Sequence, residues 1–311
     1  MPVLEDDLKE YYNFIQEQVK LLGCLDIEGS QLVWHYTTGS SLINIIETGA
    51  IYSTQVSCLN DSTEINYGSS LLRKAFVTIR AQELLDDEDT KFLLNRITSN
   101  SQTPSNPSNA PSQWFVTCFS AEGDDLSQWR AYGGGENGYA IGFMVSGLFG
   151  RNLNLVARVN YDESLHKAVA NNVANASLKF FSDGMKKNRA ASREEWAAEF
   201  LPVWSGIVER LAPMVKDKSF KAENEYRVIH ELHVQEMSQI KFVQKSTLMS
   251  RHLPLIFPPP TATHSRMLPI ARIMVGPSRH KEITKVSVDT LLRQNGYYVP
   301  VDTSIIPFHQ T

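Results

Sequence analysis

Hydrophobic residues near the start of the chain recur at helical spacing. In residues 6–22 the apolar side chains stand at i, i+3 and i+4, and Gly23 ends the run, which predicts an amphipathic helix. The stretch LVWHYT at 32–37 is a short apolar run and predicts a buried strand. The next stretch, TTGSSLINIIETG, has a helical apolar stripe between a possible cap at Thr38 or Ser40 and Gly49.

The rest of the chain mixes strand-like and helix-like patterns. Strands are expected at 50–54, 114–120, 138–143, 155–162, 225–232, 240–245 and 271–277. Helices are expected through Leu71 to Phe76 and at 87–97, 124–133, 164–186, 192–215 and 280–294. The stretch 99–113 is rich in Ser, Asn and Pro and predicts a flexible loop. Together these predict an α+β fold in a single domain, residues 1–311, with a helical insertion at about 164–215.

Composition narrows the classes of function. Hydrophobic residues make up 42% of the chain and charged residues 21%, as in a globular protein, and the net charge of −4 gives no global basic surface for nucleic acid. The three cysteines fit neither a disulfide framework nor zinc-ligand spacing. The acidic start lacks a signal peptide, and no run of about 18 apolar residues exists, so a cytoplasmic protein without a membrane span is expected.

The first candidate residues lie in the strand WHYT. Alternation places His35 and Thr37 on one face, with Trp34 and Tyr36 on the other. His35 is either a hydrogen-bonded core residue or a ring that binds a ligand hydroxyl.

A second group of candidates follows in LNDSTE. Asn60 or Asp61 could cap the next helix, with Glu64 closing a capping box, or these side chains could face a cleft. Two acids this close also suggest a metal, although no third ligand is evident in the sequence.

Two later stretches add aromatic and acidic side chains. Ser120 ends a strand, and Trp129 and Tyr132 stand at i, i+3, either as core residues or as rings that stack on a flat ligand. In ENEYR, a strand places Glu223, Glu225 and Arg227 on one face. They form either an exposed ion pair or a half-buried acid that stabilises a cation or accepts a proton.

Taken in order, these motifs resemble a bacterial family known as a domain of unknown function. The stretches that carry the resemblance are WHYT, IIETGAIYS, LNDSTE, CFS, WRAY, GYAIGF, ENEYR, VGP and SIIPF, from about residue 32 to 308. The family label by itself implies no activity.

A looser resemblance is to ADP-ribosyltransferase folds, which bind NAD in the cleft of a split β-sheet. It implies an ADP-ribosyltransferase-like core with helical insertions, in which His35 binds the nicotinamide-side ribose and Thr37 lies nearby. Ser120 shapes the cleft, and Tyr132 or Trp129 stacks on nicotinamide.

The same resemblance implies the catalytic residues. Glu225 holds the ribose 2′-hydroxyl and stabilises an oxocarbenium-like transition state, and Glu223 takes the first position of an E-x-E motif. Tyr36, Asn60, Asp61 and Arg227 complete the expected NAD-binding set.

Three functions remain open at the level of the sequence. The favoured one is an NAD-consuming enzyme, a transferase or glycohydrolase, acting as a bacterial toxin or defence effector with an unidentified acceptor macromolecule and a defence-system or antitoxin partner. The second is a metal-dependent nuclease using Asp61, Glu64 and Glu225. The third is a non-catalytic module that binds a nucleotide or a protein.

Overall fold

The computed structural model describes residues 2–59, 62–81, 87–99, 113–134, 138–148, 155–187, 192–244, 248–255 and 267–307. The chain divides into two compact units, and each unit is assembled from three separate segments. The helical unit consists of Met1–Asp26, Gln55–Trp114 and Val159–Lys221. The sheet unit consists of Ile27–Thr54, Phe115–Arg158 and Ala222–Thr311.

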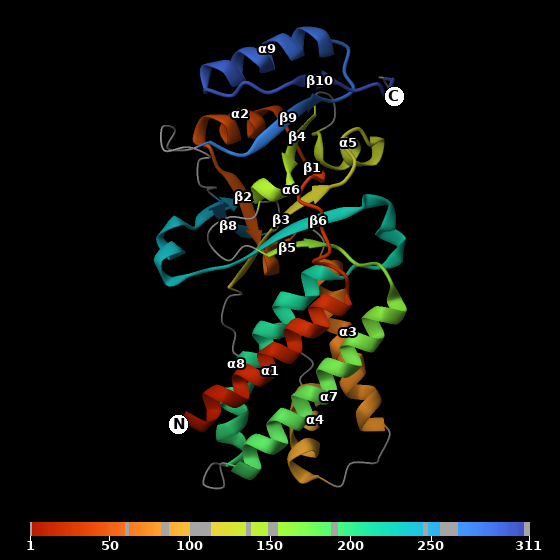
Figure 1. Ribbon diagram of the computed structural model, residues 1–311, viewed down its shortest axis with the longest axis vertical. Coiled ribbons are helices and arrows are strands. Elements are labelled where there is room, and N and C mark those ends of the chain that lie inside the picture. Colours follow the sequence, from red (N-terminus) through yellow and green to blue (C-terminus); the bar gives the residue numbers. More distant parts are fainter. Residues whose placement is uncertain are drawn as a thin grey trace. The chain divides into compact units, whose positions relative to one another are not determined.

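The helices are drawn as coils in Figure 1. The α-helices are α1 (Pro2–Leu21), α2 (Gly39–Thr48), α3 (Ser62–Ala81), α4 (Glu88–Ser99), α5 (Leu126–Tyr132), α6 (Val145–Leu148), α7 (Glu163–Lys187), α8 (Arg193–Leu211) and α9 (Lys281–Gln294). Short 3₁₀ helices are η1 (Val56–Cys58), η2 (Ala212–Met214), η3 (Lys218–Glu223) and η4 (Val234–Gln239).

In the described part of the chain, ten strands form one sheet, most of them antiparallel. The strands are β1 (Leu32–Thr37), β2 (Ile51–Gln55), β3 (Trp114–Ser120), β4 (Tyr139–Met144), β5 (Leu155–Arg158), β6 (Glu225–Glu231), β7 (Lys241–Gln244), β8 (Met249–Leu255), β9 (Ile270–Val275) and β10 (Val301–Thr303). Their order is β10-β9-β4-β1-β3-β2-β8-β7, while β6 also pairs with β3 and β5 pairs with β6.

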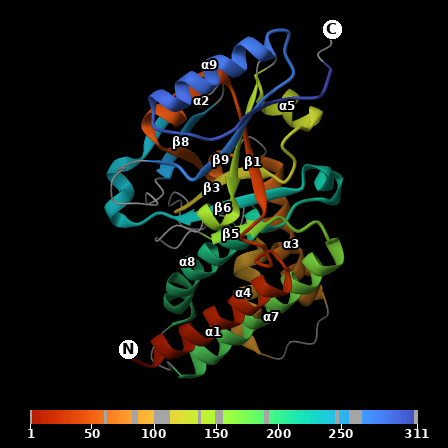
Figure 2. The same ribbon diagram turned by 45° about the horizontal axis from the view of Figure 1, so that its top comes forward.

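Helices cover both faces of the sheet around β1 and β4. On one face, α2 and α9 lie side by side (Figures 1 and 2), and their apolar stripes join Val33 and Phe143 in the main core of the unit. On the other face, Trp129 of α5 packs with Trp34 and Tyr36 in a smaller aromatic cluster. The alternation of β1 thus sends Trp34 and Tyr36 to one layer and Val33 and His35 toward the other.

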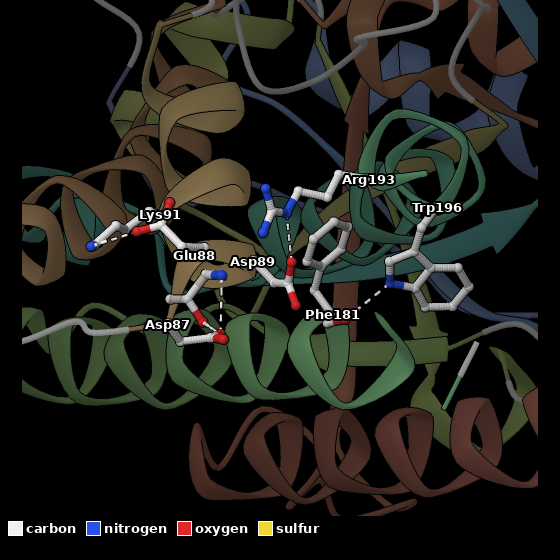
Figure 3. A network of polar contacts seen from close by, with 8 residues as sticks. Asp87, Glu88, Asp89, Lys91, Phe181, Arg193 and Trp196 are labelled. Atoms are coloured by element: carbon white, nitrogen blue, oxygen red, sulfur yellow. Dashed lines mark hydrogen bonds and ion pairs between the residues drawn. The ribbon is translucent and has the colours of Figure 1, made fainter. Parts of the chain in front are cut away.

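The helical unit is built around α7, which contacts α1, α3, α4 and α8. Its core is mostly aliphatic and includes a cluster of aromatic side chains, among them Phe181 and Trp196, which are buried between helices. Polar contacts fix the ends of the helices, as Figure 3 shows: Arg193 Nε pairs with Asp89 Oδ1 at 2.6 Å, and the Trp196 indole donates to the Phe181 carbonyl at 3.0 Å. Asp87 accepts from the Thr90 amide at 3.1 Å and so caps α4.

The fold class expected from the sequence is confirmed as α+β. The helices expected at 6–22, 164–186 and 192–215 are present as α1, α7 and α8, and the described residues include no helix with the length and hydropathy needed to cross a membrane. The single domain expected for residues 1–311 stays a prediction, beside the division of the chain into two compact units. Most of the loop expected at 99–113 lies outside the described residues.

One strand prediction was wrong at its start. Glu223 was expected on the same strand as Glu225, but it ends the 3₁₀ helix η3 and β6 begins at Glu225. Between them Asn224 has φ 42°, a left-handed conformation that breaks the strand and that Asn adopts more readily than most residues.

Candidate functional site

The candidate site lies where the sheet opens between β1 and β3. Six residue pairs align β1 with β4, from Leu32 with Met144 to Thr37 with Tyr139. Among the described residues a single pair, Trp34 with Ser120, aligns β1 with β3. The two neighbouring strands therefore separate after this pair, which leaves room for side chains at the centre of the sheet.

His35 bridges this opening with its side chain. Its Nδ1 lies 3.0 Å from the Cys118 carbonyl oxygen, which can only accept, so Nδ1 carries the hydrogen. Burial lowers the pKa of His35 below its ordinary 6.5, and the bond to the carbonyl only partly opposes this effect. The ring is therefore neutral at pH 7, and its Nε2 is left as a hydrogen-bond acceptor.

Ser120 ties the end of β3 to the residues before β6. Its hydroxyl donates to the Glu223 carbonyl at 3.1 Å and accepts from the Glu122 amide at 3.1 Å. The Ala121 amide adds a bond to the Asn224 carbonyl at 3.0 Å. These backbone contacts hold Glu223 and the first residue of β6 next to the opening.

Glu225 and Arg227 form a buried ion pair on β6. Arg227 Nε donates to Glu225 Oε1 and Nη2 donates to Oε2, both at 2.8 Å. The side chains are 8% and 1% exposed for Glu225 and Arg227, so the fork is almost fully removed from water. This bidentate geometry fixes the carboxylate, whose oxygens can each accept more than one hydrogen bond.

A small pocket of about 80 Å³ occupies the opening. It is lined by Trp34, His35, Tyr36, Cys118, Phe119, Ser120, Gln128, Tyr132, Glu223 and Glu225. Six residues that the sequence indicated as site residues thus line one pocket, although they come from four separate segments. Within this lining Glu223 is partly exposed and Tyr132 is 49% exposed, so both stand at the open side.

Some predicted site residues have packing roles, including Tyr36 of the pocket lining, and others lie outside the described residues. Trp129 is 4% exposed, packs edge to face on Tyr36, and donates its indole N–H to Asp124 Oδ1 at 2.8 Å. Tyr36 donates its hydroxyl to the Glu122 carbonyl at 2.6 Å and so anchors the turn after β3, while Thr37 is buried. Asn60 and Asp61 lie outside the described residues, as does the side chain of Glu64.

The pocket also includes residues that the sequence did not single out. Gln128 is buried at 8% exposure on α5, and Cys118 and Phe119 precede Ser120 on β3. In the sequence each of them has the pattern of an ordinary core or helix residue. They line a cavity only because β1 and β3 separate at this point. The strand alternation of WFVTCFS was the single available signal for Cys118.

The described residues contain no group of three or more His, Cys, Asp or Glu side chains that could hold a metal ion. Glu225, which the metal hypothesis required, is paired with Arg227 instead.

Comparison with known protein families finds a match, over residues 128–228, to the model of a protein family of unknown function, DUF2971. This stretch includes Gln128, Tyr132, Glu223 and Glu225 of the pocket. It supports the expected similarity to a domain-of-unknown-function family and names no activity. Searches of curated proteins and of solved structures found no match.

Proposed function

We propose that this protein is an NAD-consuming enzyme, an ADP-ribosyltransferase or NAD glycohydrolase, with the pocket between β1 and β3 as its active site. The observation that carries the proposal is the convergence of His35, Ser120, Tyr132, Glu223 and Glu225 on one opening of the sheet. On this proposal the sheet is an ADP-ribosyltransferase-like split core.

The size of the pocket limits how NAD would bind. Sites that enclose a whole ligand measure roughly 300–1,000 Å³, whereas this pocket measures about 80 Å³. It would take one ring or sugar of the dinucleotide, and the remaining part would lie along the open side. Tyr132 is half exposed there, and we propose that its ring stacks on nicotinamide.

The proposed roles follow from the hydrogen-bonding state of each group. The neutral His35 offers Nε2 as an acceptor for a hydroxyl of the nicotinamide-side ribose. Glu225, held by Arg227, would accept the ribose 2′-hydroxyl and stabilise positive charge as the bond from ribose to nicotinamide breaks. Nicotinamide leaves with the bonding electrons, and the acceptor oxygen or nitrogen forms the new bond while Glu223 takes its proton.

The biological setting we propose is a toxin or anti-phage defence effector. Depletion of NAD or modification of an acceptor macromolecule would harm a cell, so such an enzyme would need a defence-system or antitoxin partner to restrain it. This part rests on the resemblance to ADP-ribosyltransferase folds, and the pocket itself supports only the chemistry.

Release of nicotinamide from NAD tests the proposal. Purified chain is incubated with NAD, with and without cell lysate as a source of acceptor and with and without a chelator. We expect release that survives the chelator and that Glu225→Gln and Glu223→Gln abolish. The matched control is Glu231→Gln, an exposed glutamate at the end of the same strand. No release in any arm would refute the proposal.

A second candidate function is a non-catalytic module that binds a nucleotide. The observation that favours it is the bidentate pairing of Glu225 with Arg227, which partly neutralises the carboxylate. This candidate predicts that NAD raises the melting temperature of the chain without release of nicotinamide. The nuclease hypothesis predicts the opposite dependence, loss of activity with the chelator and indifference to NAD.

A further inference from the structure

Gln128 is a buried polar residue of the pocket whose side chain has no role in holding the fold together. It lies on α5, is 8% exposed, and lines the pocket together with Tyr132. Its backbone amide donates to Asp125 Oδ1 at 3.1 Å, but its side-chain carboxamide has no hydrogen-bond partner among the described residues. A buried amide without a partner costs free energy, and native proteins rarely keep one without a reason. A ligand in the pocket would supply that partner.

The start of α5 is fixed by hydrogen bonds on both sides of Gln128. Asp125 caps the helix, and its carboxylate accepts from the amides of Ser127 and Gln128. The next residue, Trp129, donates its indole N–H to Asp124 Oδ1 at 2.8 Å, and Asp124 in turn accepts from the segment that follows β10. The Gln128 side chain is therefore carried by a supported element, as a preorganised binding group requires.

The rest of the pocket lining fits a flat, uncharged ring. Trp34 and Phe119 contribute aromatic side chains to the lining. Gln128 and Tyr132 stand at i, i+4 and so share one face of α5, which brings a ring stacked on Tyr132 within one helical turn of the Gln128 carboxamide. The lining also contains the carboxylates of Glu223 and Glu225, which disfavour an anionic group on the ring.

We propose that Gln128 is a specificity-determining residue that recognises a primary carboxamide on the ring bound in this pocket. The identity of that ring, the nicotinamide of NAD, rests on the proposed function. A glutamine side chain presents a carbonyl acceptor and an N–H donor in one plane. A primary carboxamide presents the same two groups in complementary order, so the pair can form two hydrogen bonds. A methyl ketone in its place keeps the acceptor and loses the donor, which leaves the Gln128 carbonyl oxygen without a partner.

Binding of the ring alone tests this recognition without any turnover. The probes are nicotinamide and acetylpyridine, its neutral analogue in which a methyl group replaces the amino group. Ligand-observed NMR titration of the full chain gives a dissociation constant for each probe. We expect the wild type to bind nicotinamide about tenfold or more tightly than acetylpyridine. We expect Gln128→Met to bind the two probes equally, because its apolar side chain has a similar length but cannot form the two hydrogen bonds.

The ratio of the two affinities is the decisive readout, because a purely structural disturbance of α5 would weaken the binding of both probes together. Gln128→Asn, a second variant, keeps a carboxamide but withdraws it by one methylene, and it should also lower the ratio. The matched control is Gln294→Met, the same change at an exposed position at the end of α9, which should keep the wild-type ratio. A wild type that binds the two probes equally, or binds neither, would overturn the inference.

Ring release from NAD and from its acetylpyridine analogue separates this inference from the proposed function. If the wild type releases the ring and Gln128→Met keeps the same preference for NAD, the inference is wrong and the proposed function stands. If no ring is released but Gln128→Met removes the preference for nicotinamide in the titration, the proposed enzyme is refuted and the role of Gln128 in recognition is supported.

Discussion

Glu225 and Arg227 are two opposite charges that one short motif buries within the sheet unit. The two side chains stand two residues apart on one face of β6, so a single strand supplies both partners of the bidentate pair. Burial of two charges is costly unless their geometry is good, and here both carboxylate oxygens accept from the same guanidinium. The pair thus fixes the carboxylate of Glu225, and Glu225 is the member of the pair that lines the pocket.

Removal of one partner should cost far more than removal of both. Glu225→Leu leaves a buried guanidinium without this carboxylate, and we expect a loss of about 3–5 kcal/mol in the free energy of unfolding. The double variant Glu225→Leu with Arg227→Met replaces the pair by apolar side chains and should recover most of that loss. Urea denaturation measures both. A double variant as unstable as Glu225→Leu alone would show that Glu225 and Arg227 are not each other's main partners.

The double variant also distinguishes a structural role of Glu225 from a catalytic one. If Glu225 contacts substrate, the double variant folds but releases no nicotinamide. If Glu225 has a structural role alone, the stability and the activity recover together.

His35 gives a prediction for the pH dependence of stability. Its pKa in the folded chain is lowered below 6.5 by burial, so below about pH 6.5 the unfolded chain binds more protons. The free energy of unfolding is therefore expected to fall as the pH drops from about 7 to about 5. Above the pKa of the unfolded state, His35 adds no pH dependence to it. His166, whose pKa burial also lowers, acts in the same direction.

The contribution of His35 can be isolated by substitution. In His35→Asn the side-chain amide can still donate to the Cys118 carbonyl but does not titrate, so the stability should depend less on pH between about 7 and about 5. His280→Asn changes an exposed histidine and should leave the dependence as in the wild type. Urea midpoints across this range provide the measurement, and an unchanged slope in His35→Asn would count against the buried, neutral ring.

At the scale of elements, the sequence is sufficient to predict a helix where the residues at both of its ends are recognisable caps, as in α2. The helix α2 begins at the cap Thr38, whose hydroxyl accepts from the Ser41 amide, and it ends at Gly49 with φ 62°. Both signals are written in the sequence beside the apolar stripe of Leu42, Ile45 and Ile46.

The start of β6 could not be predicted in the same way. The alternation of ENEYR continues back to Glu223, and the break arises because Asn224 is held in a left-handed conformation by contacts with distant segments. The Asn224 carbonyl accepts from Ala121, and its side chain accepts from Arg158 Nη2 at 3.2 Å. The strand β8 was missed as well, since its buried positions alternate irregularly and it contains Pro254.

The capping box of α8 provides a prediction at this scale. The Ser192 hydroxyl accepts from the Glu195 amide at 3.1 Å, and Glu195 Oε2 accepts from the Ser192 amide at 2.9 Å. We expect Ser192→Ala to lower the free energy of unfolding by about 1 kcal/mol, because the Glu195 amide loses its acceptor, the Ser192 hydroxyl.

Ser287→Ala on α9 is the matched control for the cap. This serine is exposed inside a helix and donates to the Ile283 carbonyl of its own helix, so its loss should change the unfolding free energy by less than about 0.5 kcal/mol. Equal urea midpoints for the two variants would show that the cap does not limit the stability of α8.

At the scale of the whole molecule, the sequence predicted the α+β class and most of the elements but not their arrangement. The candidate site depends on contacts between residues far apart in the chain, such as Ser120 with Glu223 and His35 with Cys118. Each of these is set by strand pairing and by the opening between β1 and β3, for which no local pattern exists. The assignment of segments to two units is equally non-local, because each unit takes three pieces of the chain.

We propose that the protein cleaves NAD in the pocket between β1 and β3, and the rate of nicotinamide release tests this proposal most directly. The decisive comparison is the wild type beside Glu223→Gln and Glu231→Gln, because Glu223 is partly exposed at the pocket and its substitution leaves the buried ion pair in place. We predict release by the wild type, a loss of about a hundredfold or more in Glu223→Gln, and an unchanged rate in Glu231→Gln. No release by the wild type, or equal rates in all three proteins, would contradict the claim.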